Sequence, residues 1–282
     1  MQKKSAWQWK IKAHSGWFQW NLHELWNYKD LLRRFVRRDL IASYQQTLLG
    51  PFWIFLQPLL TTLVYWLIFS VVARVSTDGI PAILFYLPGI IAWSYFSDCL
   101  NAVMYTFVNN TSIFAKIYFP RLVVPISSTV THTVRMLVQL LLFVFMYIYF
   151  CITGPVPAPG LSLLLLPFLL LITASFSLGV GLTMSVITAR FRDLDYALQY
   201  ILRLFMFATP IVYPASLVPE KFRNLYWLNP LTPIVETFRS IFFNHTPIQW
   251  TYLGISACTS IVLGCFGITL FKKWEANITD II

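Results

Sequence analysis

Residues 51–73 read PFWIFLQPLLTTLVYWLIFSVVA, a run that contains no charged side chain. A helix needs about 20 mostly apolar residues to cross roughly 30 Å of hydrocarbon, so this run is long enough to do so. The bilayer core holds no water, and backbone groups there must be bonded within their own segment, which favours a helix over an open strand. The stretch therefore predicts a transmembrane helix.

Further long apolar runs follow it, at 81–107, 122–152, 160–188, about 197–213 and 250–271. The 282-residue chain is 57% hydrophobic and only 11% charged, with a mean hydropathy of +0.65, which is too apolar for a soluble domain of this size. The sequence therefore predicts an all-α integral membrane protein with six transmembrane helices. We expect a cytoplasmic N-terminal segment (1–49) with an amphipathic helix, a six-helix transmembrane domain (50–272) and a cytoplasmic tail (273–282).

The distribution of Lys and Arg sets the predicted orientation. With both termini in the cytoplasm, fifteen of these cations lie inside and four outside. This excess is the positive-inside pattern. The net charge of +10 then reflects topology and attraction to anionic lipids, and no nucleic-acid surface is expected. The four cysteines lie in or beside apolar runs without CxxC spacing, which favours buried thiols over disulfides or a metal site.

The segment before the first span predicts an amphipathic helix. In YKDLLRRFVRR (28–38), one face carries Leu31, Leu32, Phe35 and Val36, and the other carries Arg33, Arg34, Arg37 and Arg38. Such a helix is expected to lie in the headgroup plane with its apolar side in the acyl boundary. It is either a simple anchor or a lever joined to the first span.

The connection between the fifth and sixth spans, 214–249, is too apolar for an ordinary loop. Pro219, Pro230 and Pro233 cut it into pieces of about 10–14 residues, which are too short to cross. Backbone of this kind is tolerated at membrane depth only beside protein or a water-filled cavity. We expect re-entrant helices at the outer mouth of a pathway, and an amphipathic cap lying flat on the outer leaflet is the alternative.

Four ionisable side chains lie within apolar segments: Asp98, His132, Arg135 and Arg203. A charge at bilayer depth costs a few kcal/mol or more, so each should face the bundle interior or water and find a partner. Asp98 and Arg135 lie at similar depths along their predicted spans, so the two can form an ion pair. Arg203 is the alternative partner for Asp98. The pair either fixes helix register or lines a pathway. A single histidine with one distant aspartate indicates no catalytic pair or metal site.

Aromatic residues make up 17% of the chain. Many belong to interfacial belts, and others suit a conduit, because flat rings pack on sugar rings. Position alone suggests Tyr65, Trp66, Trp93 and Tyr95 as conduit candidates.

The chain has no GxxxxGK[ST] phosphate-binding loop, so if the protein is a pump, its energy must come from a separate subunit through the cytoplasmic loops. The longest inner loop, 108–121, is the expected docking element for a separate energy-supplying subunit. In it, a short helix offers Ile113, Phe114 and Ile117 or Tyr118 to a groove on the partner. Lys116 and Arg121 orient it, and Pro120, after Phe119, ends it.

Three stretches carry a family resemblance: RDLIASYQQTLLGPFWIFLQPLL (38–60), IFAKIYFPR (113–121) and TPIVYPASLVPEKFRNLYWLNPLTPIVETFR (209–239). They resemble permease subunits of ATP-binding cassette (ABC) exporters for cell-surface polysaccharides. The likeness is greatest to lipopolysaccharide O-antigen exporter permeases, with teichoic acid permeases as near relatives. It extends from about residue 25 to residue 272.

The resemblance implies a homodimer in the bacterial cytoplasmic membrane, bound to two ABC ATPase subunits that hold ATP and Mg; this chain itself needs no cofactor. It implies a coupling helix at 113–120 and a cytoplasmic gate helix near 28–40. It also implies an outer re-entrant gate within 214–243, with Pro219, Trp227, Asn229, Pro230, Glu236 and Arg239. The implied cargo is a polysaccharide on an undecaprenyl-diphosphate carrier, moving between the two copies. The arginines of the gate helix would attract either the diphosphate or anionic headgroups.

Two other readings remain open. One is a permease of similar build that exports a drug, a lipid or a haem-related cargo. The other is an intramembrane enzyme, such as an acyltransferase or a glycan polymerase. An enzyme would need ionisable groups converging near one membrane face, and the spans offer only the four named above.

Overall fold

The computed structural model describes residues 22–114, 116, 119–154, 156–157, 159–191, 193–243 and 247–278. Within these ranges all regular structure is helical. Five helical segments are long and apolar enough to cross a membrane: Gly50–Val72, Ala82–Met104, Val123–Thr153, Leu161–Arg190 and Trp250–Glu275. The predicted all-α membrane class is therefore confirmed.

The elements follow in the order α1 (Leu22–Asn27), α2 (Lys29–Tyr44), η1 (Gly50–Phe52), α3 (Trp53–Tyr65), η2 (Trp66–Val72), α4 (Ala82–Met104), α5 (Thr106–Phe114), α6 (Val123–Thr153), η3 (Leu161–Leu165), α7 (Leu166–Arg190), α8 (Leu194–Phe207), η4 (Ala215–Leu217), α9 (Glu220–Trp227), α10 (Leu231–Phe243) and α11 (Trp250–Ile278).

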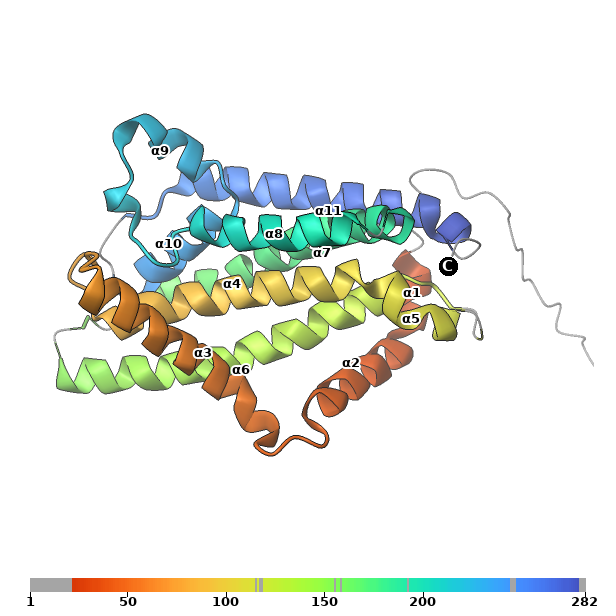
Figure 1. The fold of residues 1–282 in the computed structure, drawn as a ribbon, viewed down its shortest axis with the longest axis horizontal. Coiled ribbons are helices and arrows are strands. Elements are labelled where there is room, and N and C mark those ends of the chain that lie inside the picture. The colour runs from red at the N-terminus through yellow and green to blue at the C-terminus, as the bar shows by residue number, and fades with distance from the viewer. Residues whose placement is uncertain are drawn as a thin grey trace, which may run out of the picture.

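The long helices run along one axis, and the short elements gather at its two ends (Figure 1). One end holds α1, α5 and the end of α11; following the predicted orientation we call it the inner end. The opposite end holds α9 and α10, and we call it the outer end. The loop predicted to couple and the segment predicted to be re-entrant thus lie at opposite ends of the bundle, as the charge pattern requires.

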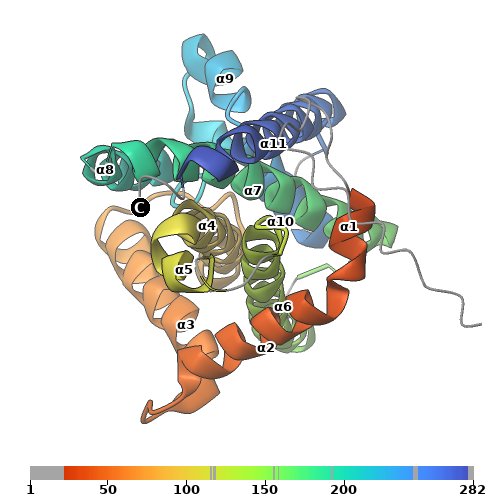
Figure 2. The same cartoon turned by 90° about the vertical axis from the view of Figure 1, so that its right-hand side faces the viewer.

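Helix α4 is the centre of the bundle. Viewed along the long axis it is surrounded by α3, α6, α7 and α8 (Figure 2). In its most apolar window 72% of residues are buried, against 11% in the first span and 17% in α6. The apolar faces of the first span and of α6 are therefore left for lipid or for another protein chain.

Helices α7 and α11 approach each other most closely at small residues. A Cβ atom on Gly179 would lie 2.5 Å from the backbone nitrogen of Gly264 and from the carbonyl carbon of Leu263. Nearby, Ser175 Oγ donates to the carbonyl of Ser260 at 3.0 Å. Small side chains let two helix backbones touch, which is how helices associate where lipid removes the usual hydrophobic drive.

The fifth predicted span is shorter than the sequence pattern indicated. Helix α8 ends at Phe207, and turns and bends follow over residues 208–213, where the apolar run had predicted helix. Its 14 residues extend about 21 Å at 1.5 Å per residue, less than a bilayer core. Pro210 and Pro214 supply the reason, because proline lacks the N–H donor that a continuing helix needs.

Two further predictions need correction. The apolar face of α2 does not lie free for the acyl boundary: Phe35 is buried against the start of α6, with its ring 5.8 Å from that of Phe119. The loop helix that the structure describes is α5, which ends at Phe114 and so includes only the first two residues of the predicted 113–120 helix. Residues 115, 117 and 118 of that predicted helix lie outside the described residues. Phe119 and Pro120 are not helical, because a proline disfavours helical backbone in the residue before it.

The contact between α7 and α11 gives a stability prediction. Gly179→Ala places a methyl group against backbone atoms that cannot rotate away, so we expect it to destabilise the fold by about 1–3 kcal/mol. Gly254→Ala is the matched control, because nothing lies within 4 Å of a Cβ there. The measurement is the midpoint temperature for loss of the monodisperse peak in size-exclusion chromatography. Equal midpoints for the two variants would show that the close approach is wrong.

Candidate functional site

The inner end is built on an apolar cluster of Phe35, Phe119, Val123 and Val124. This cluster, which we call the inner cluster, holds α2 against the start of α6. The four predicted arginines of α2 are exposed on its other face, which confirms the amphipathic pattern: Arg33, Arg34, Arg37 and Arg38. Arg38 also pairs with Asp39 at 2.8 Å, and its guanidinium lies 4.7 Å from the centre of the Phe35 ring.

The predicted coupling residues divide into two groups. Ile113 and Phe114 are partly buried against the inner cluster, and the Phe114 ring lies 6.1 Å from that of Phe107 and 5.8 Å from that of Phe119. Arg121 lies 5.7 Å from the Phe114 ring and donates to the carbonyl of Glu275, which ties the loop to α11. Lys116 is exposed. Ile117 and Tyr118 lie outside the described residues.

Three of the four predicted intramembrane residues meet at one cavity. Asp98 of α4 and His132 and Arg135 of α6 line a space of about 250 Å³ beneath the junction of α2 and α3. Both Asp98 and Arg135 are described residues, and they form no ion pair with each other. Arg135 instead donates to Ser43 Oγ and lies 5.6 Å from the ring of Tyr44.

A second cavity of about 460 Å³ adjoins the first at the inner end, and the two share Ser43, His132 and Arg135. Arg38 and Asn109 line the second cavity, so polar groups continue from the inner end to Asp98. Burial raises the pKa of Tyr44, at the end of α2, and the Arg135 guanidinium opposes that shift. The Nε of Arg135 is buried without a hydrogen-bond partner among the described residues.

Arg203 is placed differently from the other three. It is exposed on α8, and it makes no hydrogen bond or ion pair with the described part of the chain. Tyr196, Tyr200 and Phe207 are exposed on the same helix, at 82%, 63% and 52%. At about 100° per residue these four side chains form one stripe. This stripe, Tyr196–Tyr200–Arg203–Phe207, is the α8 stripe below.

The four aromatic residues suggested as conduit candidates lie in different settings. Tyr95 is only 3% exposed and its hydroxyl lies 2.8 Å from Thr133 Oγ1. Trp93 packs in the bundle against Phe96 and Phe205. Tyr65 is half-buried with its hydroxyl 3.4 Å from Met206 Sδ, whereas Trp66 is exposed on η2.

The outer end is held by a buried charge. Arg239 of α10 is 3% exposed, and its guanidinium donates to three segments. Nη1 donates to Glu236 Oε1 at 3.1 Å, Nη2 to the carbonyl of Ile211 at 3.0 Å, and Nε to that of Phe85 at 3.3 Å. Burial raises the pKa of Glu236, and the adjacent guanidinium opposes that shift.

The other predicted gate residues shape the turn between α9 and α10. Asn229 Nδ2 donates to the carbonyl of Ala208 and to Thr209 Oγ1, each at 3.1 Å, while its Oδ1 accepts from the backbone N–H of Leu231 at 3.0 Å. The carbonyl of Pro230 accepts from Ser256 Oγ at 2.6 Å. Pro219 precedes α9, and the Trp227 ring stacks on Tyr252 at 5.3 Å. The two short helices predicted here are thus present, and α10 is buried along its whole length.

Comparison with known proteins fits this architecture. Residues 30–243 match the family described as ABC-2 type transporter, which is most of the chain. The chain belongs to the ABC-2 type transporter family. This ABC-2 permease is 32% identical over 263 residues to the "O-antigen export system permease protein RfbA" of Myxococcus xanthus, covering 93% of this chain and 98% of that one. It is 29% identical over 253 residues to the protein of the same name from Klebsiella pneumoniae, covering 90% of this chain and 95% of that one.

The family and the apolar helices together make the protein a multi-pass permease of the inner membrane, and the resemblance seen in the sequence is confirmed. The family also implies an ABC ATPase as its partner.

Sequence reasoning found Glu236 and Arg239 but missed that they pair. Their i, i+3 spacing was the available signal, since such residues are neighbours on a helix. It also missed Tyr196 and Tyr200 beside Arg203; the helical spacing of the three was visible in the sequence.

The buried pair gives a second prediction. Arg239→Met or Glu236→Gln alone leaves an unpartnered buried group, and we expect each to cost about 3–5 kcal/mol of stability. The double variant should lose less than the sum of the two, because neither buried charge remains. Thermal midpoints of the purified permease measure this, and strictly additive losses would contradict the pairing. Arg38 and Asp39 are the exposed control, where the same kinds of substitution should cost about 1 kcal/mol or less.

Proposed function

We propose that this ABC-2 permease is the transmembrane subunit of an ATP-driven exporter that moves an undecaprenyl-diphosphate-linked polysaccharide, O-antigen, across the cytoplasmic membrane. The observation that carries the proposal is the near-complete coverage of relatives named as O-antigen export permeases. ATP and Mg are bound by two copies of a separate ABC ATPase, since the sequence of this chain has no phosphate-binding loop.

The cargo passes between two copies of the chain, in a channel at the homodimer interface. The α8 stripe supports this. A guanidinium at membrane depth is not stable against lipid tails, so Arg203 needs a partner chain or water in front of it. Tyr196 and Tyr200 beside it offer flat rings with polar edges, which suit a sugar chain in transit.

The diphosphate of the carrier enters at the inner end. The adjoining cavities provide a polar route between Arg38 and Arg135, and guanidinium groups form strong, often paired hydrogen bonds with phosphate oxygens. Helix α2 acts as the gate helix beside this route. Its exposed arginines also attract anionic headgroups, so the helix keeps its place at the membrane surface.

The ATPase docks on the loop between α4 and α6. Lys116 and Tyr118 contact it, and Phe114 and Phe119 transmit its movement to α2 through the inner cluster. At the outer end, α9 and α10 form the re-entrant gate. Helix α8 together with residues 208–214 forms a further membrane crossing in addition to the five long spans. Six crossings place both termini on the cytoplasmic side.

An export experiment tests the function. Deleting the gene should remove the polysaccharide from the cell surface and accumulate it inside on its lipid carrier, and the wild-type gene should restore export. Lys116→Glu should restore less than about a tenth of it and copurify less ATPase, because the charge at the docking surface is reversed. Arg74→Glu, at an exposed residue of the loop before α4, is the charge-reversal control and should export normally. Unchanged surface polysaccharide in the deletion strain would contradict the proposed function.

Cross-linking tests the dimer interface. In a variant without native cysteines, Tyr200→Cys should be linked to the second copy by a short bis-maleimide, because α8 faces the two-fold axis. Phe145→Cys is the control: it is 70% exposed on α6, which we place against lipid. The product is read as a dimer band on denaturing gels. Efficient linking at 145 with none at 200 would move the interface from α8 to α6.

A further inference from the structure

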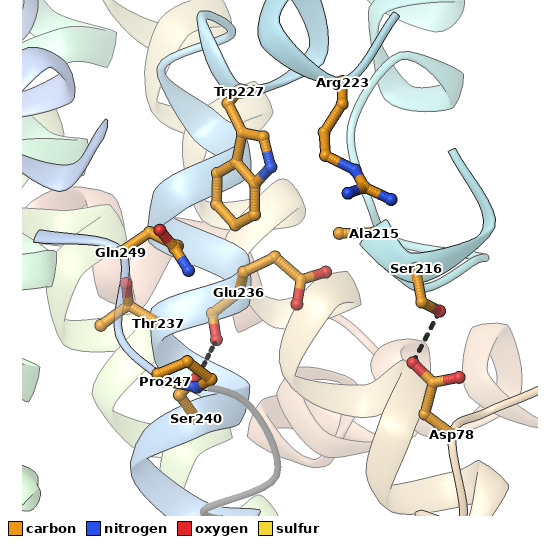
Figure 3. Close-up of a pocket in the computed structure, with 10 residues that line it drawn as sticks. All are labelled: Asp78, Ala215, Ser216, Arg223, Trp227, Glu236, Thr237, Ser240, Pro247 and Gln249. Carbon is orange, nitrogen blue, oxygen red and sulfur yellow. Dashed lines mark hydrogen bonds between the residues drawn. The ribbon is translucent and has the colours of Figure 1, made fainter. Parts of the chain in front are cut away.

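A cavity of about 240 Å³ lies at the outer end, away from the α8 stripe. Four segments contribute to it: the loop before α4, η4 with α9, α10, and the residues before α11 (Figure 3). Trp227 and Arg223 of α9 project toward it from one side, and Glu236 of α10 faces it from below in the view. Exposed residues such as Arg223 and Gln249 form part of its wall, so solvent reaches it.

The side chains of this cavity include hydrogen-bonding groups that the described part of the chain does not use. Among the described residues, the Arg223 guanidinium, the Trp227 indole N–H and the Gln249 amide have no hydrogen-bond or ion-pair partner. Glu236 is held in place by Arg239 at 3.1 Å and by a hydrogen bond from the backbone of Ala215. A carboxylate accepts about four hydrogen bonds, so Glu236 retains capacity toward the cavity.

The positions of the remaining groups are fixed by contacts within the chain. Stacking on Tyr252, with ring centroids 5.3 Å apart and planes 21° apart, sets the plane of the Trp227 indole. Asp78 Oδ2 accepts from Ser216 Oγ at 2.8 Å, which joins the loop before α4 to η4. The cavity is thus preorganised, with an aromatic ring at one wall and donors and acceptors at the others.

Charge narrows the class of ligand. The carboxylates of Asp78 and Glu236 are balanced by the guanidinium of Arg223 in the cavity and that of Arg239 behind Glu236. A balanced site favours neither a free anion nor a cation. A neutral molecule with many hydroxyl groups and a flat apolar face uses both the ring and the polar groups.

We propose that this cavity is a binding site for one neutral sugar residue of a glycan at the outer face of the permease. We call it the outer sugar site, formed by Trp227, Arg223, Glu236 and Gln249. Its size suits a single ring, because it is smaller than the roughly 300–1,000 Å³ of common small-molecule sites. This site rests on the proposed export function, because the exported polysaccharide is the source of the glycan. The glycan would be held at the site after it leaves the channel.

Binding is measured on the full permease–ATPase complex in lipid nanodiscs, by microscale thermophoresis. Glycoside detergents are avoided, since their sugar headgroups would compete for the site. The probes are neutral oligosaccharides of glucose, galactose, mannose and rhamnose, with alginate oligosaccharides as the acidic comparison. We expect at least one neutral probe to bind more tightly than alginate.

Variants locate the binding. Trp227→Leu should weaken the affinity about tenfold or more, whereas Trp227→Phe, which keeps an aromatic ring, should stay within about threefold. Arg223→Ala should also weaken it, and it does not act through the fold, because Arg223 bonds to no described residue. Trp250→Leu is the matched control: this tryptophan is 62% exposed nearby but does not line the cavity, so affinity should not change.

Each outcome separates the outer sugar site from the export function. Absence of binding to every neutral probe, preference for alginate, or equal affinity of Trp227→Leu and wild type would overturn the sugar site, even if the deletion strain loses surface polysaccharide. Conversely, Trp227-dependent sugar binding with unchanged surface polysaccharide in the deletion strain would overturn the export function and leave the site standing.

Discussion

The structure depends on one constraint: the charge of Arg239 has to be buried with partners. Its guanidinium reaches a carboxylate on its own helix and carbonyls of α4 and of the turn after α8. Losing one partner of a buried charge is far more costly than losing an exposed one. This requirement fixes the position of α10, and the non-helical turn that the prolines impose after α8 presents the carbonyl of Ile211 to the guanidinium. The outer cavity forms beside the same pair, since Glu236 belongs to both.

The two ends of the molecule are connected through a central helix and differ in how they are held. Helix α4 contributes Phe85 to the Arg239 site at the outer end and leads into α5 at the inner end. The inner end relies on the rings of Phe35, Phe114 and Phe119, which pack without directional bonds. Helices α7 and α11 form a closely packed pair on one side. On the other, the first span and the α8 stripe keep exposed faces, where a second copy and the cargo would meet them.

Much of the fold could be predicted from the sequence, because long apolar runs report bilayer crossing directly. The runs at 122–152 and 160–188 match the spans Val123–Thr153 (α6) and Leu161–Arg190 (η3 with α7) within two residues at each end, and α2 was found from its periodicity. The pattern could not say what an apolar face contacts. Phe35 was expected to face lipid and Phe114 a partner subunit, yet both pack within the chain. An apolar side chain leaves water equally well in lipid, in a partner's groove or in the chain's own core, so its hydrophobicity does not tell these surroundings apart. The pairing of Asp98 with Arg135, expected from depth along the helices, is not formed: both residues line one cavity, but Arg135 donates to Ser43. That bond depends on the tertiary position of α2, which the sequence pattern does not give.

The central claim is that the loop ending at Arg121 and the helix pair α9–α10 work on opposite sides of the membrane, one receiving energy and the other releasing cargo. Two exposed lysines report on it, Lys116 and Lys221. In a cysteine-free variant, each is replaced by cysteine and intact spheroplasts are treated with a membrane-impermeant maleimide. The account predicts labelling at position 221 and none at 116 until the membrane is opened. Labelling at 116 in intact spheroplasts, or equal labelling at both positions, would contradict it.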